Sequence, residues 1–331
     1  MRTKFAIIFL IFAVILSVFI VWPSWQKVKK AKELVTSPAP AWIEIKEIQE
    51  PLTLEIAPYE EPTRLYEKWK VVRDYLTEKL KSEGWKVEIK IAKNYDEVIK
   101  DVGLGTVDLA ILPSVAFLEA RRYYCAQPVA MPLFQGEKGI RCVLVARDEH
   151  PKLSPTYIGS PADIKGKKFV YADERSLCGT LIAHKFMREN NIVWQEGLQK
   201  VGYVQNYDAM LQAISSKDFD AGVVREPTFL EKNPPGLKVV ATSERFPDLV
   251  FATTFSFDPE IRKTILKVLE EMPKEIALRM GSGYTGWKKV DDQEFDALRK
   301  LVKELHNQDY FLPSPTFCEK KPKCKLAPAQ K

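Results

Sequence analysis

The residues best suited to hold a small solute follow the ends of predicted strands. The segment Asp173–Thr180, with the sequence Asp-Glu-Arg-Ser-Leu-Cys-Gly-Thr, joins a predicted strand to a predicted helix. Ser176 can cap this helix, so the backbone N–H groups of Leu177, Cys178 and Gly179 point outward at its start. Such groups, with the helix dipole, bind anions, and glycine allows a close backbone approach. The segment predicts an anion site, with an ordinary capped helix as the alternative.

Four further candidates stand just after predicted strands. Ser114 starts a helix behind Pro113 and either caps that helix or contacts a ligand. Tyr59 follows the first strand and offers a hydroxyl to a ligand or simply packs. Arg225 and Glu226 end another strand. They are either a solvated charged pair or groups that meet an anion and an ammonium ion, respectively.

Signals for an enzyme are weak. The sequence holds three histidines and has neither a P-loop nor a GxGxxG motif. A dyad of Cys178 and His184 is conceivable, but the spacing places the two nearer opposite faces of a helix, so His184 is expected on the surface. We expect no catalytic residue and no cofactor.

The five cysteines predict no metal site, because the sequence has no CxxC pair and no cluster of cysteine with histidine. Cys125, Cys142 and Cys178 are expected as small buried apolar residues. A local disulfide between Cys318 and Cys324 is an open alternative for the tail.

The elements that position these residues form two α/β series. The first runs from Leu52 to Tyr123 in the order strand, helix, strand, helix, strand, helix, with strands that include Leu52–Ala57 and Leu109–Leu112 and a helix over Pro62–Lys81 with one apolar face. The second runs from Cys142 to Phe255 and includes strands over Cys142–Ala146, Lys168–Ala172 and Asp220–Val224 and a helix over Leu177–Glu189. Helices dominate from Pro259 onward. This order predicts largely parallel sheets in two lobes, and ligands bind beyond the carboxyl ends of such strands.

The predicted domain organisation has five parts. An apolar run from Phe5 to Val21 gives an anchor or signal over residues 1–25, followed by a stalk over residues 26–50. An uncleaved transmembrane anchor is the preferred interpretation, since a cleavage site is missing near the end of the run. The first lobe comprises residues 51–147 and 249–317, the second lobe residues 148–248, and a Lys/Pro-rich tail residues 318–331.

The charge is concentrated at the two ends of the chain. The total is +6, of which residues 1–41 carry +5 and residues 318–331 carry +4, which leaves −3 for the body. An acidic body argues against a nucleic-acid partner. The lysines that follow the apolar run would, by the positive-inside rule alone, place the body in the cytoplasm.

Several motifs together resemble the phosphonate-binding family of periplasmic solute-binding proteins, which has the type II periplasmic-binding-protein architecture. The resemblance runs from about Leu52 to Lys303 and rests on the following segments: LEIAPY, GTVDLAILPSVAFLEA, DIKGKKFVYADERSLCGTL, YDAMLQAISSKDFDAGVV and GYTGWKKVDDQEFDALRKLV. It implies a two-lobed fold that captures a tetrahedral oxyanion in the cleft and docks on a permease or a sensor. It also places the body outside the cytoplasm, against the charge rule.

The sequence departs from the family pattern at the implied site. The family's Ser-Thr-Ser-Gly helix start is here Ser-Leu-Cys-Gly at 176–179, which removes two hydroxyls but leaves the backbone N–H groups. Phe117 replaces a tyrosine and Tyr207 replaces a histidine. Tyr207 and Asp248 enter the candidate site only by their positions.

The resulting hypothesis is a monomeric solute-binding component of an ABC-type importer for a phosphate-, phosphite- or phosphonate-like anion. A membrane-tethered sensor that signals to a membrane partner is the alternative, and Cys178 there suggests a metalloid such as arsenite. An enzyme with Cys178 as its nucleophile ranks third.

Overall fold

The described part of the chain begins after the expected anchor. A computed structural model of the chain describes residues 50–312, 314 and 316–320. The apolar run, nearly all of the stalk and most of the Lys/Pro-rich tail, including Cys324, therefore lie outside the described residues. Within the described part, no helix is both long and apolar enough to cross a membrane.

The first sheet contains β1, a strand that is buried along most of its length. Strand β1 pairs in parallel with β2 on one side and β3 on the other, as the alternation of strands and helices predicts. Strand β11 then pairs antiparallel with β3 and β4, so the sheet is mixed. Within the described residues the sheet order is β12-β4-β11-β3-β1-β2, with β5 paired to β4. The strands are β1 (Leu52–Ile56), β2 (Val87–Ile91), β3 (Leu109–Pro113), β4 (Gln127–Phe134), β5 (Glu137–Lys138), β11 (Leu249–Thr253) and β12 (Tyr284–Lys289).

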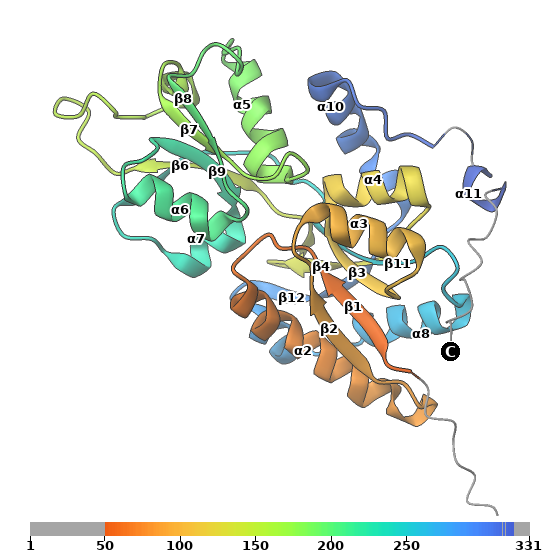
Figure 1. Cartoon of the computed structure of the whole chain (residues 1–331). Helices are drawn as coiled ribbons and strands as arrows, with labels where there is room; N and C mark the ends of the chain where they lie inside the picture. The colour runs from red at the N-terminus through yellow and green to blue at the C-terminus, as the bar shows by residue number, and fades with distance from the viewer. Residues whose placement is uncertain (1–49, 313, 315, 321–331) are drawn as a thin grey trace, which may run out of the picture. The chain divides into compact units, whose positions relative to one another are not determined.

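The second sheet is built from the middle of the chain. Its order in the described residues is β10-β6-β9-β7-β8, with β7 parallel to β8 and β9, and β6 antiparallel to β9 and β10. The strands are β6 (Cys142–Arg147), β7 (Lys168–Tyr171), β8 (Lys200–Tyr203), β9 (Ala221–Arg225) and β10 (Leu237–Thr242). We call the two sheets with their helices the first and second lobes (Figure 1).

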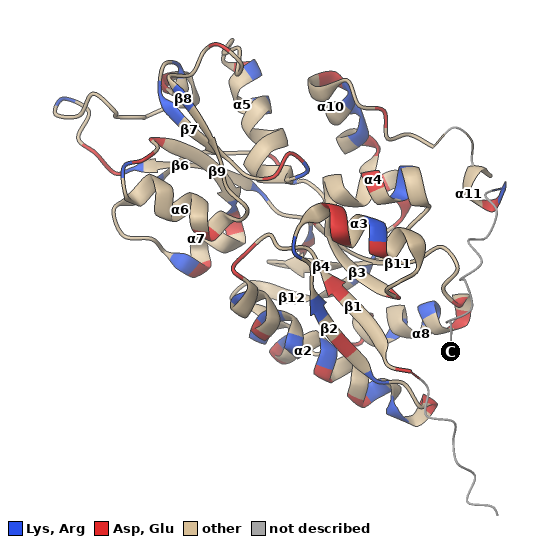
Figure 2. Ribbon diagram, viewed as in Figure 1, with Lys and Arg blue, Asp and Glu red and all other residues tan. Residues whose placement is uncertain are grey.

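Helix α2 (Pro62–Leu80) shows how the first lobe is covered. Glu61 caps it by accepting a hydrogen bond from the Arg64 backbone, and Pro62 suits the first turn. The expected apolar face is buried against the sheet: Leu65, Trp69, Val72, Leu76 and Leu80. Its outer face carries lysines, arginines and acids along its length (Figure 2). An amphipathic helix of this kind is stabilised mainly by that buried face.

The remaining helices follow the expected order with shifted ends. The first lobe carries α3 (Tyr95–Leu104), α4 (Ser114–Tyr124), α8 (Pro259–Glu270), α9 (Lys274–Ala277), α10 (Asp296–His306) and α11 (Phe317–Lys320), with 3-10 turns at Lys81–Glu83, Leu278–Met280 and Asp292–Phe295. The second lobe carries α5 (Ala183–Glu189), α6 (Tyr207–Ser215) and α7 (Glu226–Lys232), with a 3-10 turn at Pro161–Ile164. The expected helix from Leu177 to Glu189 is two pieces, because its first turn, Leu177–Ile182, is a π-helix.

Two crossing segments join the lobes and hydrogen-bond to each other. The backbones of Ile140 and Phe246 exchange two N–H···O bonds, each 2.9 Å long. Gly139 sits beside this bridge with a φ of +76°, and a β-carbon there would lie 2.1 Å from the Phe246 carbonyl oxygen. Only glycine fits, so this crossing has a fixed path between the lobes.

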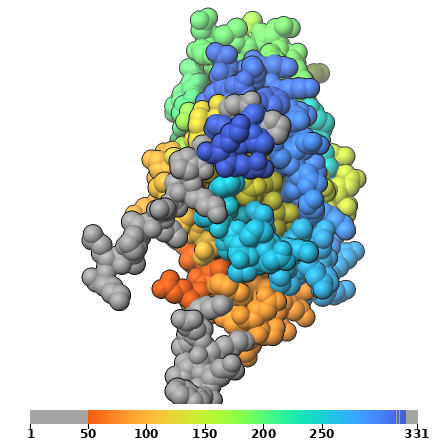
Figure 3. All heavy atoms as spheres, turned by 90° about the vertical axis from the view of Figure 1, so that its right-hand side faces the viewer, coloured from red at the N-terminus to blue at the C-terminus, as the bar shows by residue number. Residues whose placement is uncertain are grey.

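The cysteines form two disulfides, which corrects two expectations. Cys318 pairs with Cys125 at the end of α4, with their α-carbons 5.5 Å apart, and not with Cys324. Cys142 pairs with Cys178, with their α-carbons 5.3 Å apart, so neither is a simple buried apolar residue. In each disulfide the two cysteines lie far apart in sequence and are brought together only by the fold. The Cys125 link holds the C-terminal segment, dark blue in Figure 3, against the first lobe.

Candidate functional site

The predicted helix start after β7 has the geometry of a capped helix. The Ser176 side chain accepts a hydrogen bond from the Gly179 N–H at 3.1 Å, which confirms Ser176 as the N-cap. A β-carbon at Gly179 would approach the Ala172 side chain to 2.4 Å, so glycine is needed for the close packing on Ala172, the residue that follows β7. Leu177 and Cys178 are buried. The opening turn is a π-helix, a form often found at functional sites.

Tyr207 lies directly against this helix start. Its hydroxyl is 2.8 Å from the Ser176 hydroxyl, and both side chains are buried. Burial raises the pKa of Tyr207 to about 12, so it stays a neutral hydroxyl that can donate or accept a hydrogen bond. The Tyr207 N–H also donates to the Tyr59 carbonyl at 3.2 Å, which brings the second lobe to the end of β1.

Tyr59 occupies the predicted position after β1 and is buried. Its hydroxyl accepts a hydrogen bond from the Trp69 indole at 2.9 Å, and burial raises its pKa well above the usual value. The Arg225 guanidinium lies 5.0 Å from the centre of its ring. A cation in this position interacts favourably with the ring face, so Tyr59 forms part of the wall around Arg225.

Arg225 is not solvated and does not pair with Glu226, so the surface-pair interpretation is wrong. It is buried and donates to Asp248 from Nη2 at 2.5 Å and from Nε at 3.0 Å. It also reaches the Tyr284 hydroxyl at 3.1 Å and Glu60 at 3.4 Å. Burial would lower the pKa of Arg225, but Asp248 and the other partners outweigh it and raise the pKa further. The arginine is therefore a fixed cation that already has its counterions.

Glu60 and Lys68 complete this buried cluster, and sequence reasoning missed both. Lys68 donates to Glu60 at 2.7 Å, and the Thr228 hydroxyl donates to Glu60 at the same distance. Burial would raise the pKa of Glu60, but Lys68 and Arg225 hold it at about 2. A signal existed, because Lys68 lies three residues after Leu65 on the apolar face of α2.

Three further candidate residues, Ser114, Glu226 and Phe117, have no polar contact of the kind expected at a binding site. Ser114 is the first residue of α4 and not its cap, since Pro113 precedes the helix, and its buried hydroxyl has no hydrogen-bond partner among the described residues. One carboxylate oxygen of Glu226 is likewise buried and unpartnered there. Phe117 packs on Phe295, with ring centres 4.9 Å apart, in the first-lobe core.

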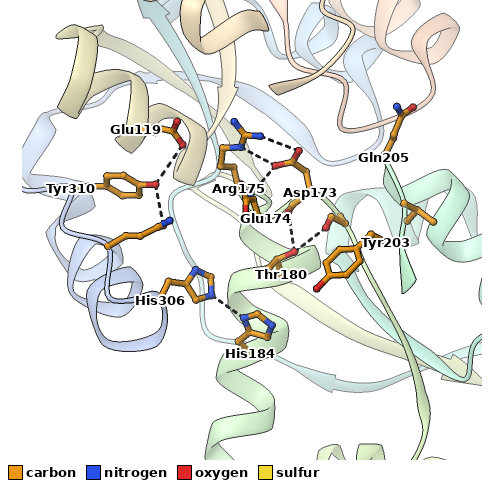
Figure 4. A pocket seen from close by; sticks show the side chains of 13 residues that line it. Glu119, Asp173, Glu174, Arg175, Thr180, His184, Tyr203, Gln205, His306 and Tyr310 are labelled. Carbon is orange, nitrogen blue, oxygen red and sulfur yellow. Dashed lines mark hydrogen bonds and ion pairs between the residues drawn. The ribbon is translucent and has the colours of Figure 1, made fainter. Parts of the chain in front are cut away.

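An open pocket of about 690 Å³ lies between the two lobes on the outer side of the segment that precedes Ser176 (Figure 4). Arg175 borders it and joins the lobes, because it bonds Asp173 at 3.1 Å and Asp96 of α3 at 2.5 Å. His184 also lines the pocket. It is largely buried and hydrogen-bonded to His306, which corrects the expectation of a surface histidine.

The comparisons with known proteins identify the family. Residues 54–295 match the sequence model described as "ABC transporter, phosphonate, periplasmic substrate-binding protein". This match spans most of the chain. The chain belongs to this family.

Solved structures share the fold of this substrate-binding protein at low sequence identity. One is a binding protein component of a phosphonate ABC transporter from Pseudomonas aeruginosa (18% identity, 78% of this chain and 87% of that chain covered, TM-score 0.67). Another is PhnD1 from Prochlorococcus marinus in complex with methylphosphonate (16% identity, 78% and 98% covered, TM-score 0.67). A third is an alkanesulfonate-binding protein from Xanthomonas axonopodis pv. citri bound to MOPS (11% identity, 78% and 93% covered, TM-score 0.57).

The lobes of this substrate-binding protein are closed on each other. Besides the contacts of Arg175, Arg225 and Tyr207, polar contacts cross between the lobes at Glu61–Asp208 (2.9 Å), Arg64–Glu231 (3.0 Å) and Arg188–Glu304 (3.1 Å). The helix start, Tyr207 and the Arg225 cluster are thereby enclosed. What they offer to a ligand is neutral hydroxyls and backbone N–H groups other than that of Gly179, which is bonded to Ser176. The charges of the Arg225 cluster are already paired.

A metal does not fit the acidic cluster that the described residues form beside β1 and β2. Glu55, Glu97 and Asp101 approach one another, but the Lys90 amine lies among them at 2.8, 3.1 and 2.6 Å. Burial raises the pKa of Glu55 to about 7, against the effect of Lys90. The ammonium group of Lys90 takes the place that a cation would need.

Proposed function

We propose that the interlobe cleft captures a small tetrahedral oxyanion of the phosphate, phosphite or phosphonate class for delivery to an ABC permease. The observation that carries this proposal is the capped helix start, with Ser176, Gly179 and the Tyr207 hydroxyl enclosed between the lobes. Neutral donors at a helix start suit a buried oxyanion, because they supply hydrogen bonds without a further buried charge. Methylphosphonate in the structure of the Prochlorococcus protein supports the ligand class.

The ligand-contacting residues that we propose are those around this helix start. Ser176, Leu177, Cys178 and Gly179 supply the cap and the backbone groups, and Tyr207 supplies a hydroxyl. Ser114 adds an unpartnered buried hydroxyl. Of the remaining candidates, the proposed walls comprise Tyr59, Arg225, Glu226 and Asp248, whereas Phe117 packs against Phe295 in the first-lobe core.

The protein works outside the cytoplasm, as its family does. Two disulfides support this location, since such bonds persist mainly in oxidising compartments. We propose further that residues 5–21 form an uncleaved anchor and that the body is a monomer. The metalloid sensor and the Cys178 enzyme both need a free thiol, and the bond from Cys178 to Cys142 removes it.

The test is thermal unfolding of the full chain with phosphate, phosphite, methylphosphonate, sulfate and arsenate. A ligand at a hundred times its Kd stabilises the folded state by about 2.7 kcal/mol, which raises the melting temperature visibly. We expect a shift with at least one phosphorus oxyanion, abolished in Ser176→Ala. Ser160→Ala is the matched control, because Ser160 also starts a helix, in an exposed capping box of the second lobe. No shift with any oxyanion contradicts the proposal.

A further inference from the structure

A pair of histidines joins the two lobes at the edge of the open pocket. His184 of α5 and His306 at the end of α10 place Nδ1 and Nε2, respectively, 2.8 Å apart. The ring centres lie 5.1 Å apart with planes at 77°, so the two nitrogens face each other edge to edge. Figure 4 shows the two rings facing each other, each from its own helix. The arrangement is a hydrogen bond between imidazoles and not a pair of ligands that converge on a metal.

The surroundings hold His184 in place and keep water from it. Its ring stacks on Trp194, with ring centres 4.4 Å apart and planes at 15°, and it meets the Tyr171 ring at 5.0 Å. The side chain is 9% exposed. A positive charge on this ring loses most of its hydration, so burial, together with His306, lowers the pKa of His184 to about 3. Burial also lowers the pKa of His306.

The neighbouring charges do not compensate a charged pair. Among the described residues, no carboxylate is hydrogen-bonded to either imidazole. Glu174 favours a charge on His306, but it is exposed. Around the pocket and on α5, most of the other charged or titratable groups have partners of their own: Arg175 with Asp173 and Asp96, Glu119 with Tyr310, Arg188 with Glu304, and Lys185 with Glu189 and Glu244, while the Tyr203 ring stacks on Tyr171. On α10, Arg299 pairs with Asp296 and Lys303 with Asp309.

Only one proton can lie between two imidazole nitrogens that share a hydrogen bond. The bond needs an N–H on one ring and a lone pair on the other. When both rings are protonated, two N–H groups and two like charges face each other, and the contact cannot persist. The hydrogen bond between His184 and His306 therefore exists only while at least one of the two histidines is neutral.

We propose that the His184–His306 pair is a proton-sensitive latch that holds the lobes closed at neutral pH and releases them in mildly acid solution. In the open form the facing nitrogens of both rings meet water, and the rings take up protons closer to the ordinary histidine pKa of about 6.5. Each proton that only the open form binds then raises the ratio of open to closed protein by up to about tenfold for each pH unit below that value. The pKa values of both histidines are lower in the closed form than in the open form. Their hydrogen bond therefore stabilises the closed form above about pH 6.5, and this stabilisation is lost as the pH falls.

The latch would let acidity weaken solute capture, whatever the solute is. A binding protein whose closed form is less populated has a proportionally higher apparent Kd. This inference goes beyond the proposed ligand class, because it concerns closure and not the oxyanion site. Its test needs no ligand, so its outcome does not depend on whether an oxyanion binds.

The experiment is hydrogen–deuterium exchange by mass spectrometry on the full chain, from about pH 7.5 to about pH 5, corrected for intrinsic exchange. We expect amides in the peptides of α5 and α10 to lose protection on acidification, by up to about tenfold per pH unit, while α8 peptides stay unchanged. The double variant His184→Asn with His306→Gln keeps an amide hydrogen bond at the same atoms but cannot titrate. It should show no pH-dependent loss.

A second comparison separates the latch from a general loosening. Arg188→Ala removes a lobe-to-lobe ion pair from the same two helices, and it should lower protection equally at all these pH values. Equal acid loss in the double variant and the wild type overturns the proposal, as does unchanged protection in the wild type. Should the double variant fail to fold, imidazole C2-hydrogen exchange of the wild type decides. Protonation midpoints of His184 and His306 that coincide with the loss of protection support the latch, and midpoints unrelated to it overturn the latch.

Discussion

At the residue scale, the contact between the lobes contains buried acidic and basic side chains that are paired with one another. Glu60 accepts bonds from Lys68 and Thr228, and Asp248 holds Arg225. All four charged side chains are buried. A buried ion pair stabilises a protein little by itself, but the loss of one partner leaves an uncompensated charge. The cluster is therefore sensitive to single substitutions, and it holds the two lobes in one electrostatic arrangement.

Glu60→Gln tests this sensitivity. We expect the variant to lose about 3–5 kcal/mol of the free energy of unfolding at neutral pH, because Lys68 and part of Arg225 are left without a counterion. The pKa of Glu60 is lowered to about 2. Its contribution is thus present above the unfolded value of about 4.3 and is lost as the pH falls toward the folded value. The difference between the wild type and the variant should accordingly shrink below about pH 4.

The measurement for Glu60→Gln is denaturant unfolding at several pH values. Glu88→Gln is the control, since Glu88 lies on β2 in an exposed pair with Lys86 and should change stability by less than about 1 kcal/mol. Equal effects of the two substitutions would contradict the buried-charge account.

The same pairing predicts which phosphonate is preferred, provided that the proposed function holds. Glu60 and Asp248 already have cations as partners, so an ammonium group on the ligand would find no free carboxylate in this cluster and would face Lys68 and Arg225. We expect propylphosphonate to bind at least about tenfold more tightly than 2-aminoethylphosphonate, which has a similar length. Isothermal titration at neutral pH measures the ratio. The reverse order contradicts the assignment and would point to Glu226, whose buried carboxylate oxygen has no partner among the described residues.

At the element scale, the disulfide from Cys142 to Cys178 ties the helix start to strand β6. Cys142 is the first residue of β6, directly after the crossing segment, and Cys178 is the second residue of the π-helix. The bond fixes the turn whose N–H groups we assign to the ligand. The link from Cys125 to Cys318 only fastens the C-terminal segment to the end of α4.

The double variants Cys142→Ser/Cys178→Ser and Cys125→Ser/Cys318→Ser are a matched pair. Each should lose about 2–4 kcal/mol of stability, because each removes one crosslink from the unfolded chain. Only the first should weaken methylphosphonate binding, since it alone loosens the helix start. Chemical denaturation and titration calorimetry give both quantities. Weaker binding in both variants, or in neither, would show that the helix start does not depend on its disulfide.

The elements themselves could be predicted only in part. Alternating and apolar runs predicted the bounds of β1, β3, β6, β7 and β9 to within a residue or two, and helical spacing predicted the buried face of α2. Strands β4 and β12 were missed because Pro128 and Pro132 interrupt the first and Gly286 shifts the register of the second. The π-helical turn at Leu177–Ile182 could not be predicted either, because its periodicity differs little from an α-helix over six residues.

At the scale of the whole molecule, the site depends on contacts that no local pattern encodes. The pairs Cys125–Cys318, Lys68–Glu231 and His184–His306 are each separated by more than a hundred residues. Sequence reasoning placed Ser176 and Gly179 at a helix start and Tyr59 after a strand, because strand ends and helix starts have local signals. Tyr207 entered only by its position in the family resemblance. It could not show that Arg225 forms an ion pair with Asp248, since that pairing depends on how the two lobes meet.

Closure of the lobes gives the last prediction. Arg175 precedes the helix start and bonds Asp96 of the first lobe at 2.5 Å, so it stabilises the closed form. Removing a bridge worth about 1 kcal/mol lowers the closed-to-open ratio about fivefold. In Arg175→Ala we therefore expect methylphosphonate to dissociate about fivefold faster, with little change in the association rate. Stopped-flow kinetics measures both rates.

Arg73→Ala is the control, because Arg73 pairs with Asp74 within α2 and touches no residue of the second lobe in the described structure. An unchanged dissociation rate in Arg175→Ala would mean that the buried cluster around Arg225, and not the outer bridge, holds the lobes together over a bound ligand.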